Sequence, residues 1–235
     1  MAEQANTPRN LLTSLVLVFP LFIIYQVGVL FTLPLLNGAD FVTTVLFASL
    51  GLTLKGYLVF LSLVILGFVL ALALLKRTQQ FNGKVFLPVL LESAVYALTM
   101  GSVIVLLMTK VLGISPTLAT GLPEQGLATR LVMSLGAGVY EESVFRLGLL
   151  SGCITLFDRV LGMNRWAAVL GAFALSSVVF SLVHYLPPMG DPFGFGSFTF
   201  RVLAGIIFGA LYKLRGFAVA VYTHAFYDVF VLVMH

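Results

Sequence analysis

The chain has 235 residues, of which 60% are hydrophobic and only 9% are charged. Soluble domains typically carry about 25% charged residues, so this composition excludes a water-soluble protein. The net charge of +4 comes from Lys and Arg residues scattered one or two per loop. That distribution is typical of topology signals at the ends of membrane helices, and it predicts a lipid bilayer as surroundings and no nucleic-acid partner. The single cysteine, Cys153, offers neither a disulfide nor a Cys-based zinc site.

The apolar runs predict the elements of the fold. A helix that crosses the hydrocarbon core needs about 20 apolar residues, so a chain of this length holds roughly seven crossings and no separate soluble domain. The runs lie at 10–36, 56–75, 85–109, 129–156, 166–186, 198–212 and 217–234. Backbone groups must be paired within lipid, and these runs do not alternate as barrel strands would, so all seven should be helices. We therefore predict an all-α, polytopic transmembrane helical bundle that forms one domain, 1–235.

Two features of the topology follow from the sequence. The first apolar run lacks a signal-peptide cleavage site, so we expect a retained first span. The segment 41–54 is short and precedes Lys55, which favours an interfacial or re-entrant helix and leaves an eighth span open as the alternative.

The distribution of basic residues predicts the orientation in the membrane. With seven spans, the face that holds the N-terminus collects eight basic residues and the opposite face four. The first group is Arg9, Lys76, Arg77, Lys84, Arg159, Arg165, Lys213 and Arg215, and the second is Lys55, Lys110, Arg130 and Arg201. Because cytoplasmic loops carry the excess of Lys and Arg, we expect a cytoplasmic N-terminus in a prokaryotic inner (plasma) membrane.

Several ionisable residues lie inside these apolar runs. A charged side chain at the centre of a membrane helix costs at least ~2.5–3.5 kcal/mol, so each one requires a compensating reason. They are Glu92 in the third span, Glu141, Glu142 and Arg146 in the fourth, His184 near the end of the fifth, and His224 and Asp228 in the seventh. Intramembrane ionisable groups mark functional sites by default, so this cluster is the candidate site.

The fourth span carries two adjacent acids and a base. Glu142 and Arg146 stand four residues apart with the acid first, the favoured geometry for an ion pair within one helix. Glu141 lies about 100° further round the helix, so it can face a cavity rather than the arginine. The spacing therefore predicts a structural ion pair and one carboxylate left for chemistry.

The fifth and seventh spans add two histidines. His224 and Asp228 share one helix face, as do Phe180 and His184, because residues four apart lie above one another on a helix. Together with Glu141, they can line one water-containing pocket within the membrane. This constellation predicts a hydrolytic centre in an intramembrane cavity.

Other interpretations of the same residues stay open. A single histidine or Glu92 more often joins membrane helices by hydrogen bonds. Buried Glu and His side chains also serve proton relays, which keeps a transporter or a peptide-binding immunity protein as the alternative function. If a metal is present, Glu141, His184 and His224 would bind it as a zinc site with one open position. Because no His-Glu-x-x-His helix occurs, we expect no metal or other cofactor.

Three motifs carry a resemblance to a known family. They are Glu-Glu-x-x-x-Arg at 141–146, Phe-x-x-x-His at 180–184 and His-x-x-x-Asp at 224–228, in this order on successive apolar helices. This arrangement closely resembles the CPBP family, the CAAX-protease and bacteriocin-processing group also called Abi proteins, whose third motif ends in Asn or Asp. The resemblance covers about the last 110 residues, so 127–235 is the expected catalytic core.

The resemblance implies an intramembrane endopeptidase of the glutamate type. By this carry-over Glu141 and His184 activate a water, and His224 with Asp228 stabilises the oxyanion. An ionised aspartate cannot donate a hydrogen bond, so we expect Asp228 to orient His224 instead. The implied partner is a membrane-anchored protein or peptide substrate, cut at a C-terminal sorting signal, a prenylated CAAX tail or a peptide leader.

The side on which the site opens is a further expectation. The charge-derived topology puts His184 near the external end of its span, which favours an exported substrate, whereas a prenylated CAAX protein requires a cytosol-facing site. The loop 186–196, which follows His184, is rich in Pro, Gly and aromatic residues. It is either a gate for the substrate or an ordinary connector with turn residues.

Overall fold

The fold was obtained as a computed structural model, which describes residues 10–32, 39–40, 53–116, 126–186 and 190–234. Within these ranges the chain is helical and contains no β-strand, as predicted. The first half consists of α1 (Leu11–Thr32), α3 (Leu54–Leu75), a 3₁₀ turn (Gly83–Val85) and α4 (Phe86–Leu106), which continues as a π-helix over Leu107–Leu112. The second half consists of α5 (Leu127–Gly136), α6 (Ser151–Thr155), α7 (Arg165–Val183), α8 (Phe195–Arg215) and α9 (Phe217–Met234).

Five described helices are long and apolar enough to cross a membrane, namely Leu11–Thr32, Lys55–Leu75, Gly83–Leu112, Arg165–Val183 and Phe195–Arg215. The last helix, α9, is apolar but shorter by the same measure. The fourth predicted span is helical from Leu127 to Val160, although its hydrogen-bonding pattern changes several times along its length. The all-α transmembrane prediction is therefore confirmed. The predicted segment 41–54 falls almost wholly outside the described residues.

The fourth span alternates between α- and π-helix. Segments of π-helix cover Ala137–Glu141, Ser143–Leu150 and Leu156–Val160, and α6 lies between the last two. The hydrophobic pattern did not predict this feature. The two helix types differ in which carbonyl each backbone N–H reaches, and a long apolar run is compatible with both. Most π-helix occurs as single turns, frequently at functional sites. Here the motif Glu-Glu-x-x-x-Arg lies within such segments.

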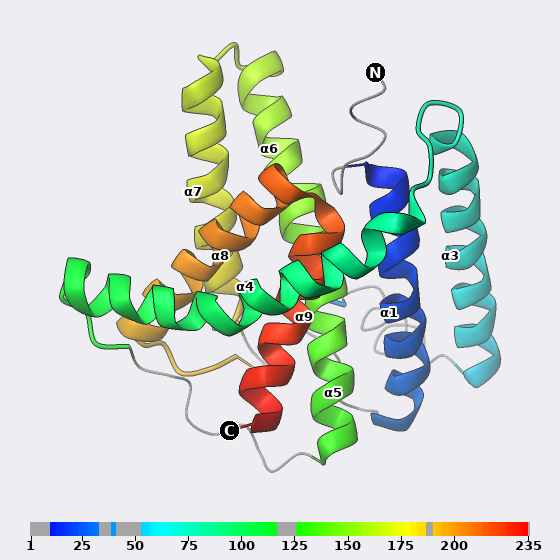
Figure 1. Ribbon diagram of the computed structural model, residues 1–235, viewed down its shortest axis with the longest axis horizontal. Coiled ribbons are helices and arrows are strands. Elements are labelled where there is room, and N and C mark those ends of the chain that lie inside the picture. Colours follow the sequence, from blue (N-terminus) through cyan, green and yellow to red (C-terminus); the bar gives the residue numbers. More distant parts are fainter. Residues whose placement is uncertain (1–9, 33–38, 41–52, 117–125, 187–189, 235) are drawn as a thin grey trace.

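The helices place the loops at two ends of the molecule (Figure 1). The upper end in that view holds the start of α1, the connection from α3 to α4, and the turns from α6 to α7 and from α8 to α9. The lower end holds the end of α1, the starts of α3 and α5, the connection from α7 to α8, and the end of α9. Helix α4 runs obliquely across the bundle. The start of α1 and the end of α9 therefore lie at opposite ends of the molecule.

Burial separates a packed centre from a lipid-facing rim. The upper half of α9 is enclosed by α1, α4 and the fourth span, and its residues Phe217–Ala225 are all buried. In contrast, α3 buries Tyr57 near its start but exposes Val59, Leu63, Leu66 and Leu70 along its length. Exposed aliphatic side chains are favourable in lipid, so α3 is suited to the periphery of the bundle. The motif residues lie on the central helices.

Candidate active site

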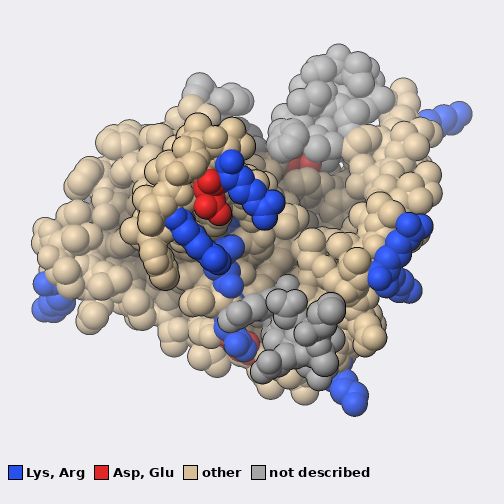
Figure 2. All heavy atoms as spheres, turned by 90° about the horizontal axis from the view of Figure 1, so that it is seen from above, with Lys and Arg blue, Asp and Glu red and all other residues tan. Residues whose placement is uncertain are grey.

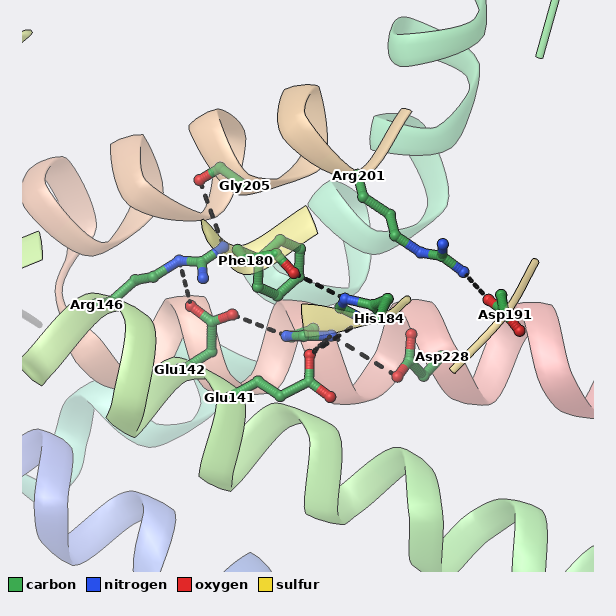
Figure 3. Close-up of polar contacts among 10 residues, drawn as sticks. Glu141, Glu142, Arg146, Phe180, His184, Asp191, Arg201, Gly205 and Asp228 are labelled. Carbon is green, nitrogen blue, oxygen red and sulfur yellow. Dashed lines mark hydrogen bonds and ion pairs between the residues drawn. The ribbon is translucent and has the colours of Figure 1, made fainter. Parts of the chain in front are cut away.

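The three motif helices meet around the centre of α9. Gly138, in the fourth span, allows that helix to approach α9 closely, because a Cβ at this position would lie 2.7 Å from the carbonyl oxygen of Val221 and 2.8 Å from Cβ of Ala225. Helix α7 packs on the other side, where Ser176 Oγ donates to the carbonyl oxygen of Phe145 at 2.8 Å. The structure thereby brings Glu141, Glu142, Arg146, Phe180, His184, His224 and Asp228 into one cluster, and Figure 3 labels most of them.

Glu142 and Arg146 form the most deeply buried part of the cluster. Arg146 Nε lies 3.1 Å from Glu142 Oε2, and the two side chains are 1% and 0% exposed. Arg146 Nη2 donates to the carbonyl oxygen of Gly205 at 3.4 Å. Its guanidinium also lies over the rings of Phe180 and Phe208, at 4.5 and 5.5 Å from the centroids. The predicted ion pair is therefore present, and cation–π contacts supplement it.

Glu141 faces away from the arginine and toward the two histidines. Its Oε2 atom lies 3.8 Å from Nε2 of His184 and 3.8 Å from Nε2 of His224. These distances exceed a direct hydrogen bond, but they suit groups joined through one water molecule. Of the two adjacent acids, Glu141 is the one that meets both imidazoles at a polar, partly open position.

His184 is held by the backbone of its own helix. Its Nδ1 atom lies 2.7 Å from the carbonyl oxygen of Phe180. A carbonyl oxygen only accepts hydrogen bonds, so Nδ1 carries the proton and Nε2 of the neutral ring has a free lone pair. The ring also packs edge-on against Phe180, with centroids 5.1 Å apart. The basic nitrogen of His184 is thus turned toward Glu141.

Besides Glu141, two further carboxylates lie near the ring of His224, one beside each of its nitrogens. Its Nδ1 atom lies 2.8 Å from Glu142 Oε1, whereas Asp228 Oδ2 is 3.7 Å from Nε2. The geometry thus differs from the expected one, since the sequence pointed to Asp228 as the residue that orients this ring. Glu142 takes that position because it reaches across from the fourth span. Asp228 lies instead on the Nε2 side of the imidazole.

Helix α8 supplies contacts that the sequence analysis did not anticipate. The ring of Phe208 stacks on His224, with centroids 4.4 Å apart and an interplanar angle of 17°. Gly205, in the same helix, accepts from Arg146 and approaches α7 so closely that a Cβ would lie 3.0 Å from Cα of Ser177. Gly205 and Gly209 form a small-xxx-small pattern, which is typical of close helix packing in membranes. That pattern was the signal that could have placed α8 beside the site.

Two ion pairs flank the cluster at its two ends. Arg201 in α8 pairs with Asp191, whose backbone N–H donates to the carbonyl oxygen of His184 at 2.9 Å. At the other end, Arg215 Nη2 donates to Glu92 Oε2 at 2.9 Å. Glu92 therefore contacts the end of α8 rather than the catalytic cluster.

The expectation that no metal is bound stays a prediction. Among the residues that the structure describes, no group of three His, Cys, Asp or Glu side chains is placed to share a metal ion. The side chains of Glu141, His184 and His224 converge, but as groups that a hydrogen-bonded water would join.

Comparison with known proteins gives one match. Residues 123–230 match the family described as type II CAAX prenyl endopeptidase Rce1-like, a segment that contains all three motifs. No curated protein and no solved structure matches the chain. The Rce1-like proteins are CAAX-type intramembrane endopeptidases of the CPBP group. Through this carboxyl-terminal segment, the chain is similar to the Rce1-like (CPBP, or Abi) family of membrane proteases.

Proposed function

We propose that this protein hydrolyses a peptide bond near the end or the anchor of a membrane-anchored protein, with a water activated by Glu141 and His184. The observation that carries the proposal is the convergence of Glu141 Oε2 on Nε2 of His184 and of His224, each at 3.8 Å. These three atoms would surround a water at the point where the three motif helices meet.

The nucleophile in this mechanism is the water held between Glu141 and His184. Both groups can accept a proton, because Nδ1 of His184 is occupied by the carbonyl of Phe180 and Nε2 faces Glu141. As the water attacks the carbonyl carbon, its proton passes to Glu141 or His184. That proton then goes to the departing amine when the C–N bond breaks. A positioned acid–base group of this kind contributes about 10²- to 10⁴-fold in rate.

The oxyanion of the tetrahedral intermediate would be stabilised by His224. In its protonated form this ring donates to Glu142 through Nδ1 and can donate to the oxyanion through Nε2. Stacking on Phe208 fixes the plane of the ring, so the donor is aimed before the substrate arrives. A preorganised donor to an oxyanion can be worth about 2.7–4 kcal/mol.

Glu142 and Arg146 would act as the support for these groups. Glu142 binds His224 with one oxygen and Arg146 with the other. With His224 protonated, the two cations offset two of the three carboxylates, Glu141, Glu142 and Asp228. This balance makes a dense charged cluster tolerable inside an apolar bundle.

The proposal is tested by comparing membrane peptides from cells that express the native chain with peptides from cells that express Glu141→Gln at an equal level. Mass spectrometry should reveal trimmed tails or leaders only with the native chain. If the two peptide sets match in several hosts, although the purified native chain is correctly folded, the protease assignment is overturned. A protein that only binds or transports a peptide would leave the two sets alike.

A further inference from the structure

The exposure of the active-site residues increases in one direction through the cluster. Glu142 and Arg146, which lie toward the upper end, are 0% and 1% exposed. His184 and Asp228, which lie toward the lower end, are 28% and 23% exposed at their side chains. Burial along α9 follows the same order, because Phe217–Ala225 are buried whereas 226–231 are half-buried. The site is therefore closed above and open below.

The open side leads to the aqueous boundary at the lower end. His184 follows directly on the last residue of α7, and its carbonyl oxygen accepts from the backbone of Asp191 in the connection to α8. The side chain of Asp191 is 32% exposed and pairs with Arg201. Charged side chains on a connecting segment belong at the water-facing boundary of the membrane, so this boundary lies about one helical turn from His184. Figure 3 shows Arg201 and Asp191 on the side of His184 away from Arg146.

The basic residues are concentrated at the other end of the molecule. Among the described residues, seven Lys or Arg residues lie near the upper ends of helices and three near the lower ends. The upper set is Lys76, Arg77, Lys84, Arg159, Arg165, Lys213 and Arg215; the lower set is Lys55, Arg130 and Arg201. Lys110 belongs to the far end of α4, which Figure 1 shows at neither end of the molecule. One of the lower three, Arg201, pairs with Asp191. Figure 2, which looks onto the upper end, shows Lys and Arg distributed around that face with few acidic side chains. An excess of Lys and Arg in short connections marks the cytoplasmic face.

We infer that the active-site cavity opens on the non-cytoplasmic face of the membrane. Given the proposed protease function, on which this inference rests, the substrate is an exported membrane-anchored protein whose cleavable segment lies just outside its anchor. A cytosolic protein with a lipidated tail would meet the basic upper end, where Glu142 and Arg146 close the site. The orientation thus selects the substrate class.

Cysteine labelling tests the orientation without requiring any substrate. Cys153 is replaced by Ala, and single cysteines are introduced as Thr78→Cys at the upper end, Thr53→Cys at the lower end, and Asp228→Cys inside the site. Thr53 and Thr78 are both exposed threonines and flank the two ends of α3, so they form a matched pair. A membrane-impermeant sulfonated maleimide is added to bacterial spheroplasts that express each full-length variant.

We expect Thr53→Cys and Asp228→Cys to react in intact spheroplasts, and Thr78→Cys to react only after permeabilisation. If Thr78→Cys reacts in intact spheroplasts and the other two variants react only after permeabilisation, the membrane orientation is reversed and the inferred substrate class is overturned. If Asp228→Cys and Thr78→Cys both react only after permeabilisation, the active site opens to the cytoplasm, and the inference is overturned as well.

The position of natural cut sites gives a second, independent measurement. Among single-span proteins that are trimmed by the native chain but not by Glu141→Gln, cuts should lie on the non-cytoplasmic flank of the span. Cuts on the cytoplasmic flank would overturn the inferred side of opening. If no cuts are found at all, the proposed protease function fails, and the labelling result still decides the orientation of the cavity.

Discussion

The two adjacent glutamates of the fourth span show how position within one cluster separates two roles. Glu142 is fully buried and binds Arg146 and His224, whereas Glu141 faces two imidazoles across gaps of 3.8 Å at the partly open side. The two residues have the same chemistry and are neighbours in sequence. Their difference teaches that a carboxylate enclosed with an arginine and a histidine serves the structure, whereas a carboxylate that faces two imidazoles is placed for reaction. The predictions that follow test this contrast.

Glu141→Gln should have the largest effect on activity. Loss of the proposed base should lower turnover by about 10²- to 10⁴-fold, while thermal unfolding in detergent changes little. Glu92→Gln is the matched control, since Glu92 is also a glutamate inside a span but pairs with the half-exposed Arg215. Equal losses of activity in the two variants would contradict a special role for Glu141.

Glu142→Gln should act mainly on stability. The substitution leaves Arg146 buried without its counter-ion, and breaking a buried pair in this way typically costs about 3–5 kcal/mol. The measurement is the free energy of unfolding in detergent. The double variant Glu142→Gln with Arg146→Met removes both charges and should recover much of the loss. A double variant as unstable as the single one would argue against a pairing role.

Gly138→Ala tests the close approach that brings Glu141 to His224. The added Cβ would lie 2.7 Å from the carbonyl oxygen of Val221, so the two helices must separate. Such overpacking typically costs about 1–3 kcal/mol, and activity should fall with it. Gly152→Ala is the control on the same span, because a Cβ there meets nothing within 4 Å. The idea fails if both alanine variants unfold at the same temperature and retain activity.

Asp228→Asn should have a smaller effect. Glu142 holds Nδ1 of His224, and Asp228 lies 3.7 Å from Nε2, so an uncharged amide can occupy the same place and donate to an oxyanion. We expect kcat/KM to stay within about tenfold of the native value, equivalent to about 1.4 kcal/mol. A loss as large as that of Glu141→Gln would mean that the carboxylate of Asp228 takes part in proton transfer.

Chelation should have the smallest effect. Because the described His and acidic side chains are not arranged as a three-ligand metal site, prolonged dialysis of the purified protein against a chelator should leave proteolysis unchanged. Loss of activity that zinc restores would instead support Glu141, His184 and His224 as metal ligands.

The sequence alone determined the class of fold and which ionisable residues are candidates for the site. Long apolar runs can only be helices in lipid, and the cost of burying charge makes intramembrane Glu, Arg, His and Asp conspicuous. Spacing of four residues was enough to pair Glu142 with Arg146, because that interaction lies within one helix. The helix boundaries were less well predicted, as α8 begins at Phe195 rather than 198.

Only the tertiary structure decided how residues from different helices meet. Spacing cannot tell which carboxylate reaches Nδ1 of His224, since Glu142 and the histidine are 82 positions apart. The stacking of Phe208 and the approach of α9 to Gly138 likewise depend on how helices pack, which small differences in side-chain shape control. The closed and open ends of the cavity arise in the same way. Periodicity places a residue on a helix face, whereas packing against other helices determines whether that face meets protein, lipid or water.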